Sequence, residues 1–190
     1  MGSRPQPSEP TEHERLWLGR CQAGDGAAFQ PLMRPYLAGL LALARRHCRD
    51  PHWAEDLVQE TLVRAFRGLP AFRGDAALRT WLYRILVRLA SEPQRWQRSF
   101  RAEPLDVDVP DGLGTPAADA AMARELQDRL DEAMERLTPR QRTALHLRAV
   151  EGMDYAAIAA VLACTPVAAR MHVLAARRKV LDRVREHLEP

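Results

Sequence analysis

The sequence predicts an all-α protein of two small helical domains that a flexible acidic linker joins. Apolar side chains recur at intervals of three and four residues in most of the chain, which is the period of an amphipathic helix. One segment interrupts this pattern with prolines, glycines and carboxylates. At 190 residues and 46% hydrophobic, the chain has enough apolar material for one core or for two small ones.

The first expected elements precede residue 50. Residues 1–11 are polar and predict a disordered leader. A short helix is expected over 12–23 and a longer one over 27–48. Pro31 and Pro35 lie early in the longer helix, where a missing N–H donor is tolerated or causes a kink.

The stretch 53–85 predicts two further helices with a compact turn between them. Gly68 and Pro70 end the first, and Asp75 is the expected N-cap of the second, which runs to about residue 90. Their apolar stripes are long enough to bury one another. We therefore expect a first domain over 12–99.

An acidic linker over 100–116 leads to a second domain over 117–190. Thr138, Asp154 and Thr165 precede apolar-periodic segments and are expected N-caps, with Gln141 completing a capping box. A short helix, a tight turn and a longer basic helix form the order of a helix-turn-helix motif. The expected helices are 117–137, 139–150, 155–162 and 166–187.

The last helix has the side chains that a DNA major groove requires. One side is apolar and must face the domain core, so the opposite side points outward. Exposed apolar groups can touch thymine methyls, while arginines reach guanine or phosphate. An ordinary solvated basic face would carry the same cations. The core side comprises Ala169, Val173, Ala176 and Val180, and the outward side Met171, Leu174, Ala175 and Arg178, flanked by Arg170 and Arg177.

Charge and cysteine usage limit the remaining choices. The net charge is only +3, so any nucleic-acid surface must be local. Lys179 is the only lysine, so such a surface would consist of arginines. A genome rich in G and C would also produce this preference for arginine over lysine. Cys21, Cys48 and Cys164 are isolated, which predicts no disulfide framework and fits a reducing cytoplasm. No apolar run reaches the length of a membrane span, and the N-terminus has no signal-peptide core.

We expect neither a metal site nor a catalytic site. His47 and Cys48 are adjacent and cannot face one site on a helix, and Pro51 separates them from His52. The sequence has no Gly-rich phosphate loop, nucleophile elbow or His/Asp/Ser set. An enzyme and a resident cofactor are therefore not expected.

From about Arg15 onward the chain resembles the extracytoplasmic-function sigma factors of bacteria. EDLVQET followed by AFRGDAALRTWLYRI is similar to their conserved region two, and ERLTPRQRTALHLRAVEGMDYAAIAAVLACTPVAARMHVLAARRKV is similar to region four. Ala163 stands where region four usually has a turn glycine. The resemblance implies a protein that binds core RNA polymerase and directs promoter recognition and transcription initiation. It also implies an anti-sigma partner.

The resemblance implies three sets of functional residues. Acidic and amide groups on the first long helix would meet arginines of polymerase, although a solvated polar face has the same composition. Next, the turn and the helix after it would capture the melted minus-ten strand, with Trp81 in the core but Tyr83 and Arg84 exposed. The third set would bind the minus-thirty-five duplex. The sets are Asp56, Gln59 and Glu60 for polymerase; Phe72, Arg73, Asp75, Thr80, Tyr83, Arg84 and Arg88 for minus-ten DNA; Arg140, Arg142, Arg170, Met171, Leu174, Ala175, Arg177, Arg178 and Lys179 for minus-thirty-five DNA.

Two other functions fit parts of the sequence. A sigma-like decoy would sequester an anti-sigma factor without promoting transcription, but it would not need the cations Arg170, Arg177 and Arg178. A dimeric helix-turn-helix regulator would bind palindromic DNA and would need a separate dimer surface.

Overall fold

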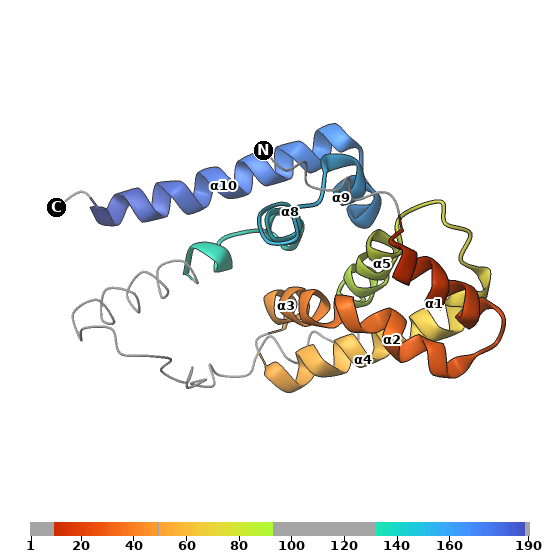
Figure 1. The fold of residues 1–190 in the computed structure, drawn as a ribbon. Helices are drawn as coiled ribbons and strands as arrows, with labels where there is room; N and C mark the ends of the chain where they lie inside the picture. Colours follow the sequence, from red (N-terminus) through yellow and green to blue (C-terminus); the bar gives the residue numbers. More distant parts are fainter. Residues whose placement is uncertain (1–9, 49, 93–131, 189–190) are drawn as a thin grey trace, which may run out of the picture.

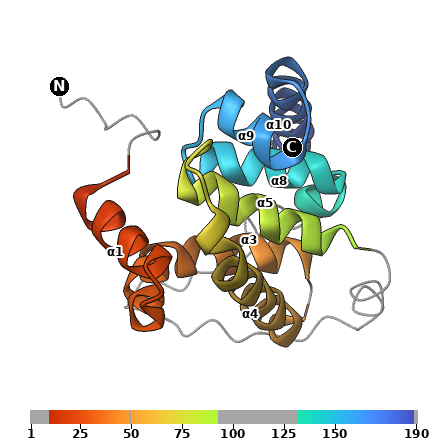
Figure 2. The same cartoon turned by 90° about the vertical axis from the view of Figure 1, so that its right-hand side faces the viewer.

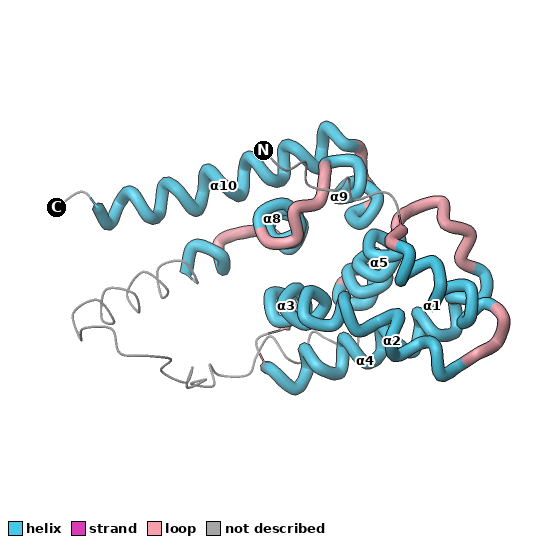
Figure 3. Tube along the Cα trace, viewed as in Figure 1, coloured by secondary structure: helices cyan, strands magenta, loops and turns pink. Residues whose placement is uncertain are grey.

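The computed structural model describes residues 10–48, 50–92 and 132–188, and all regular elements within these ranges are helices (Figures 1 and 3). This confirms the expected all-α class. Within the same ranges no single helix has the length and apolar character to cross a membrane; only the sharply bent pair of α9 (Tyr155–Leu162) and α10 (Pro166–Leu188), taken together, would. The helices are α1 (Glu12–Gln22), η1 (Gly26–Ala28), α2 (Phe29–Met33), η2 (Arg34–Tyr36), α3 (Leu37–His47), α4 (Pro51–Gly68), η3 (Leu69–Ala71), α5 (Leu78–Ala90), α8 (Pro139–Ala149), α9 (Tyr155–Leu162) and α10 (Pro166–Leu188).

The helices stack in layers (Figure 2). Helix α4 lies on one outer side, and α3 and α5 form the middle layer. Helices α8 and α9 pack on the other side of the middle layer, and α10 lies outermost on them. We call residues 10–92 the N-terminal unit and residues 132–188 the C-terminal unit. Buried side chains of both units form one continuous apolar cluster, since α5 packs against α4 on one side and against α9 on the other. The linker over 100–116 and most of the helix expected over 117–137 lie outside the described residues.

The helix expected over 27–48 is broken into pieces. Pro35 has no N–H to donate, and the chain forms the 3₁₀ turn η2 there before α3 begins at Leu37. Pro31 is tolerated within α2 because it lies in the first turn, where the N–H groups have no intrahelical partner. The break lets α1 and α2 pack together as a separate pair at one end of the unit (Figure 1).

The central pair of helices forms as expected, with shifted starts. Helix α4 begins at Pro51 because Asp50 is its N-cap and accepts a hydrogen bond from the His52 N–H at 2.8 Å. Asp75 is not the N-cap of α5, contrary to expectation. That position is Ala77, which makes no side-chain cap hydrogen bond, so the turn after α4 extends further than its sequence indicates.

The predicted caps of the C-terminal unit are confirmed. Thr138 and Gln141 form both hydrogen bonds of a capping box at the start of α8. Asp154 accepts from the Ala157 N–H at 2.7 Å, and Thr165 accepts from the Ala168 N–H at 3.1 Å. These local signals place the starts of α8, α9 and α10 without tertiary information.

Ala163 adopts a left-handed conformation, with φ 50°, at the turn between α9 and α10. This region costs a side chain with a Cβ roughly 1–2 kcal/mol, whereas glycine enters it freely.

Ala163→Gly is expected to stabilise the protein by about 0.5–1 kcal/mol, less than the full strain because glycine also favours the unfolded chain. Denaturant unfolding measures the change. The matched control is Ala156→Gly on the exposed side of α9, which should destabilise by a similar amount. A loss at both positions would show that Ala163 is unstrained.

Candidate nucleic-acid interface

Helix α10 presents the outward face that its periodicity predicts. Ala169, Val173 and Ala176 are fully buried, whereas Met171 and Leu174 are 58% and 44% exposed. Arg170 and Arg177 are also exposed, and Ala175 is half-buried. Exposed apolar groups between cations are costly in water but suit a groove that offers thymine methyls beside phosphates.

Helices α9 and α10 meet at 96°, within the range of helix-turn-helix motifs. The turn is short because Ala163 reverses the chain and Thr165 caps α10 at once. Four buried side chains of the eight-residue α9 hold it in the core: Ile158, Ala159, Val161 and Leu162. The motif therefore places α10 on the outside of the C-terminal unit (Figure 1).

The cations expected near phosphates differ in their surroundings. Arg140 is exposed at the start of α8. Lys179 is exposed and donates to Gln141 Oε1 at 3.1 Å. Arg142 is half-buried and donates to the main-chain oxygens of Arg46 and Met134 at 2.9 and 3.2 Å. In this conformation Arg142 therefore connects the two units.

The minus-ten set on α5 faces the C-terminal unit. Thr80 is 5% exposed and Tyr83 is 1% exposed, so the expectation of an exposed Tyr83 is wrong. The reason is tertiary, because α9 and the turn before it cover this side of α5. Arg84 is exposed as expected, but its Nε donates to the Ala160 carbonyl at 3.0 Å. Arg88 is exposed on the last turn of α5.

The turn before α5 combines an aromatic pair with exposed charges. The rings of Phe72 and Trp81 are tilted with centroids 5.1 Å apart, and both side chains are half-buried. Trp81 was expected to lie in the core, but its side chain is only half-buried. Gly74 has φ +78°, which a side chain would strain, and Arg73 and Asp75 are exposed on either side of it.

A pocket of about 240 Å³ lies where the turn before α5 meets the start of α9. Asp75, Arg79 and Thr80 line it from the N-terminal unit, and Met153, Asp154 and Ala157 from the C-terminal unit. Thr80 and Asp75 belong to the minus-ten set. The pocket adjoins this set only while the two units are in contact.

The outward side of α4 carries the polymerase set. Asp56 and Gln59 are exposed, while Glu60 is half-buried and accepts from Arg64 Nε at 3.0 Å. Val63 and Phe66 extend the same side and are 42% and 52% exposed.

The exposure of Val63 and Phe66 does not follow from the sequence analysis. Phe66 follows the spacing of the buried stripe, yet it is 52% exposed and makes an edge contact with Phe29, with ring centroids 5.1 Å apart. Val63 lies seven residues after Asp56, which places both on one side of the helix. Counting exposed apolar residues on the acidic side would have found Val63.

Within the described ranges no group of three or more His, Cys, Asp or Glu side chains could hold a metal ion. The three cysteines are free thiols. Burial raises the pKa of Cys48 to about 11, so it is an unreactive core thiol. His47 contacts Thr143 Oγ1 at 3.0 Å and belongs to the contact between the units.

Comparison with known proteins identifies the family. Sigma-70 region 2 matches residues 32–99, and Sigma-70 region 4 matches residues 127–180. RNA polymerase sigma-H factor of Pseudomonas aeruginosa is 32% identical over 179 residues, which cover 89% of this chain and 92% of the relative. ECF RNA polymerase sigma-E factor of Escherichia coli is 30% identical over 181 residues, which cover 90% and 94%.

Two solved structures share the fold. CnrH in complex with the cytosolic domain of CnrY matches 92% of this chain and 99% of its own, with a TM-score of 0.66 and 24% identity. Sigma factor RpoE in complex with the anti-sigma factor NepR from Bartonella quintana matches 83% and 96%, with a TM-score of 0.61 and 24% identity. From the two matched regions and the two curated relatives, the chain belongs to the extracytoplasmic-function sigma factors of the sigma-70 family.

Proposed function

We propose that this sigma factor binds core RNA polymerase through α4 and contacts a promoter through α5 and α10. One observation supports this most directly: α4 and α10, whose exposed faces differ in chemistry, lie on opposite outer sides of the molecule (Figure 2). The face on α4 combines carboxylate, amide and apolar groups, which suit a protein partner. The face on α10 combines arginines and apolar groups, which suit duplex DNA.

The proposed division of labour follows the domains expected from the sequence. Residues 12–99 would contact polymerase and the single-stranded minus-ten element, and residues 117–190 the minus-thirty-five duplex. Each DNA contact would be weak alone and effective when polymerase spaces both along one promoter. Arg142 would have to leave its carbonyl partners before it could reach a phosphate.

A double substitution on α4 tests this function. Asp56→Ala with Gln59→Ala is expected to reduce run-off transcription at least about tenfold, because removing two interface contacts costs on the order of 1–2 kcal/mol or more. The assay uses purified core polymerase and a pool of promoters from the host genome, with and without this protein. New, defined start sites in the presence of the wild-type chain are the primary result.

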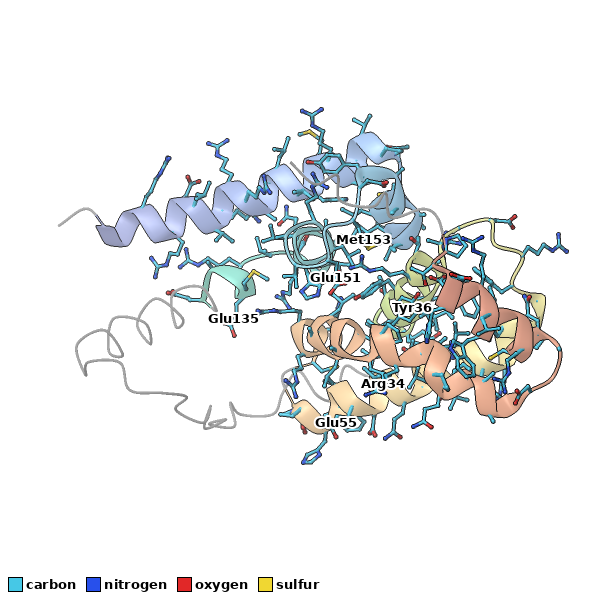
Figure 4. The ribbon with its side chains drawn as sticks, viewed as in Figure 1. Arg34, Tyr36, Glu55, Glu135, Glu151 and Met153 are labelled. Carbon is cyan, nitrogen blue, oxygen red and sulfur yellow. The ribbon has the colours of Figure 1, made fainter. Side chains whose placement is uncertain are left out.

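Glu55→Ala is the matched control (Figure 4). It removes an adjacent exposed carboxylate that points about 100° round the helix from Asp56. This variant is expected to transcribe as the wild type does. Equal losses at both sites would show that overall charge matters and not the proposed face, and no initiation by the wild-type chain would favour a decoy.

We further propose an anti-sigma partner, a cytoplasmic location and the absence of catalytic chemistry. The support for the partner is that both solved structures contain a second protein, named an anti-sigma factor in one of them. Co-purification from the native host tests it. A protein that is recovered alone and is constitutively active would contradict the partner.

A further inference from the structure

The turn between η3 and α5 is held by a side chain from the other end of the N-terminal unit. Gln22 is the last residue of α1, and its Nε2 donates to the Phe72 carbonyl at 2.8 Å and to the Leu69 carbonyl at 3.4 Å. These acceptors lie 50 and 47 residues later in the chain. Helix α1, which packs against η3, therefore fixes the main chain where it leaves η3 (Figure 1).

The contact requires a side chain that donates hydrogen bonds. Both partners of Gln22 are main-chain carbonyl oxygens, which only accept, so the amide nitrogen and not the amide oxygen must face the turn. The Leu69 carbonyl also accepts from the Phe72 N–H at 3.0 Å, which closes η3. The shorter bond of Gln22, to Phe72, holds the first residue after η3.

Local structure alone fixes this turn poorly. The described residues 72–77 lie between η3 and α5 and belong to neither helix, and Gly74 among them has φ +78°. Ala77, at the N-cap position of α5, makes no side-chain cap hydrogen bond. Arg73 and Asp75 are exposed. A segment with an exposed backbone and few buried side chains opens at a low free-energy cost, so a contact from another helix strongly affects its conformation.

A second contact holds the ring of the residue whose carbonyl Gln22 binds. The Phe72 ring lies against Trp81, with centroids 5.1 Å apart. Trp81 in turn packs on the end of α4, since a methyl group at Gly68 would lie 3.0 Å from Trp81 Cζ2. Main chain and side chain of Phe72 are thus both held, and the exposed Arg73 follows directly after this fixed residue.

Helix α1 can support the turn because it is itself packed. Trp17, Leu18 and Cys21 lie against the apolar cluster. Near the end of the helix, Arg20 forms an ion pair with Asp25 at 2.6 Å and lies over the Trp17 ring at 4.6 Å from its centroid. The Gln22 side chain therefore extends to the turn from a helix end that is held in place.

We propose that Gln22 is a positioning residue for minus-ten recognition, because it holds the turn that carries Phe72 and Arg73. Binding of a melted strand needs aromatic faces and cations at fixed places along the bases and phosphates. A turn that is already ordered loses less conformational entropy on binding than a mobile turn does. The role in minus-ten recognition rests on the proposed function, whereas the anchoring of the turn rests only on the contacts of Gln22.

Hydrogen exchange of the full-length protein, followed by mass spectrometry, tests the anchor. Gln22→Met keeps the length of the side chain and removes the donor. The amides of residues 69–77 are expected to exchange several-fold faster in this variant, up to about tenfold for the loss of a neutral hydrogen bond. Gln22→Lys retains N–H donors and should restore slow exchange.

Gln30→Met is the matched control. Gln30 is exposed on α2, and its substitution should leave the exchange of residues 69–77 unchanged. Circular dichroism confirms that each variant is folded. Exchange of these residues that is equally fast in the wild type and in Gln22→Met would overturn the anchor, and so would equal acceleration in Gln30→Met.

Two measurements with core polymerase separate positioning from general stability. Fluorescence anisotropy of the labelled protein measures its affinity for core polymerase. Permanganate reactivity of thymines measures the melting of a promoter found in the run-off assay. Gln22→Met is expected to leave the affinity unchanged, because α4 is not altered, and to reduce melting several-fold. A general loss of stability would lower both.

The outcomes distinguish the anchor from the proposed function. Faster exchange with unchanged promoter melting would overturn the role of Gln22 in minus-ten recognition. Equal losses of polymerase affinity and of melting would show that Gln22 is a structural residue only. If the wild-type chain initiated no transcription, the proposed function would fail and the role of Gln22 in recognition with it, although faster exchange in Gln22→Met would still establish the anchor.

Discussion

Replacing Gly39 with alanine is expected to destabilise the folded protein by about 1–3 kcal/mol, as overpacked sites do. The sign is opposite to that of helix propensity, which favours alanine over glycine by up to about 1 kcal/mol. The added methyl in α3 would collide with the Tyr83 hydroxyl and lie 2.8 Å from Glu151 Oε1. Tyr83 is 1% exposed, so its ring cannot move into solvent without separating the units. Denaturant unfolding followed by circular dichroism measures the loss.

Gly19→Ala is the matched control for this substitution. Gly19 lies on the exposed side of α1, and a Cβ there would meet no atom within 4 Å. It is expected to stabilise the protein by about 0.5–1 kcal/mol through helix propensity alone. A similar gain at Gly39 would contradict close packing of α3 against Tyr83 and Glu151. The radius of gyration of Gly39→Ala should also increase if the methyl group separates the units.

Lowering the pH below about 6.5 is expected to destabilise the folded protein through His47. Burial lowers the pKa of His47 to about 4, and the neighbouring Arg142 and His146 act in the same direction. The unfolded chain binds this proton more readily than the folded chain does. The stability contribution is therefore complete above pH 6.5 and is lost progressively as the pH falls towards 4. The loss is at most about 3.5 kcal/mol, since one pKa unit corresponds to about 1.4 kcal/mol.

Unfolding at several pH values, for the wild type and for His47→Gln, measures this effect. Glutamine is uncharged and can donate a hydrogen bond to Thr143 Oγ1, whose own proton goes to the Pro139 carbonyl at 2.9 Å. The difference between the two profiles should therefore grow between pH 6.5 and 4. Burial lowers the pKa of His146 as well, which leaves some acid sensitivity in the variant. The control His52→Gln removes an exposed imidazole from α4, so its pH profile should differ from that of His47→Gln as the wild-type profile does. Parallel profiles for wild type and His47→Gln would contradict the lowered pKa.

Local signals in the sequence predict the structure best where a capping residue or a strict helical period is sufficient without tertiary contacts. The capping box at Thr138 and the caps at Asp154 and Thr165 form as expected, because each requires only residues within one turn. The buried and exposed sides of α10 also follow its period, because this helix packs on one side only. Asp75 does not cap α5, whose N-cap position is Ala77, because a side chain suited to capping does not by itself determine where a helix begins.

Helix α5 shows why the minus-ten surface was harder to predict. Its residues are amphipathic, so periodicity predicts a single buried side, with Tyr83 on the exposed side. The helix is covered on two sides, by α4 and by α9, and the second cover comes from residues more than 70 positions later in the chain. The periodicity of a helix indicates which of its sides is apolar, but it does not indicate that a second helix covers another side.

The sequence by itself determined the starts and caps of α8, α9 and α10, the family and the outward face of α10, since each depends on short-range spacing or on a long ordered motif. Only the tertiary structure decided that Glu151 meets Arg79 and Tyr83, and that the minus-ten side of α5 is covered. The physical reason is that an ion pair between units depends on how two surfaces dock, and a turn carboxylate such as Glu151 has no local partner that would indicate its role.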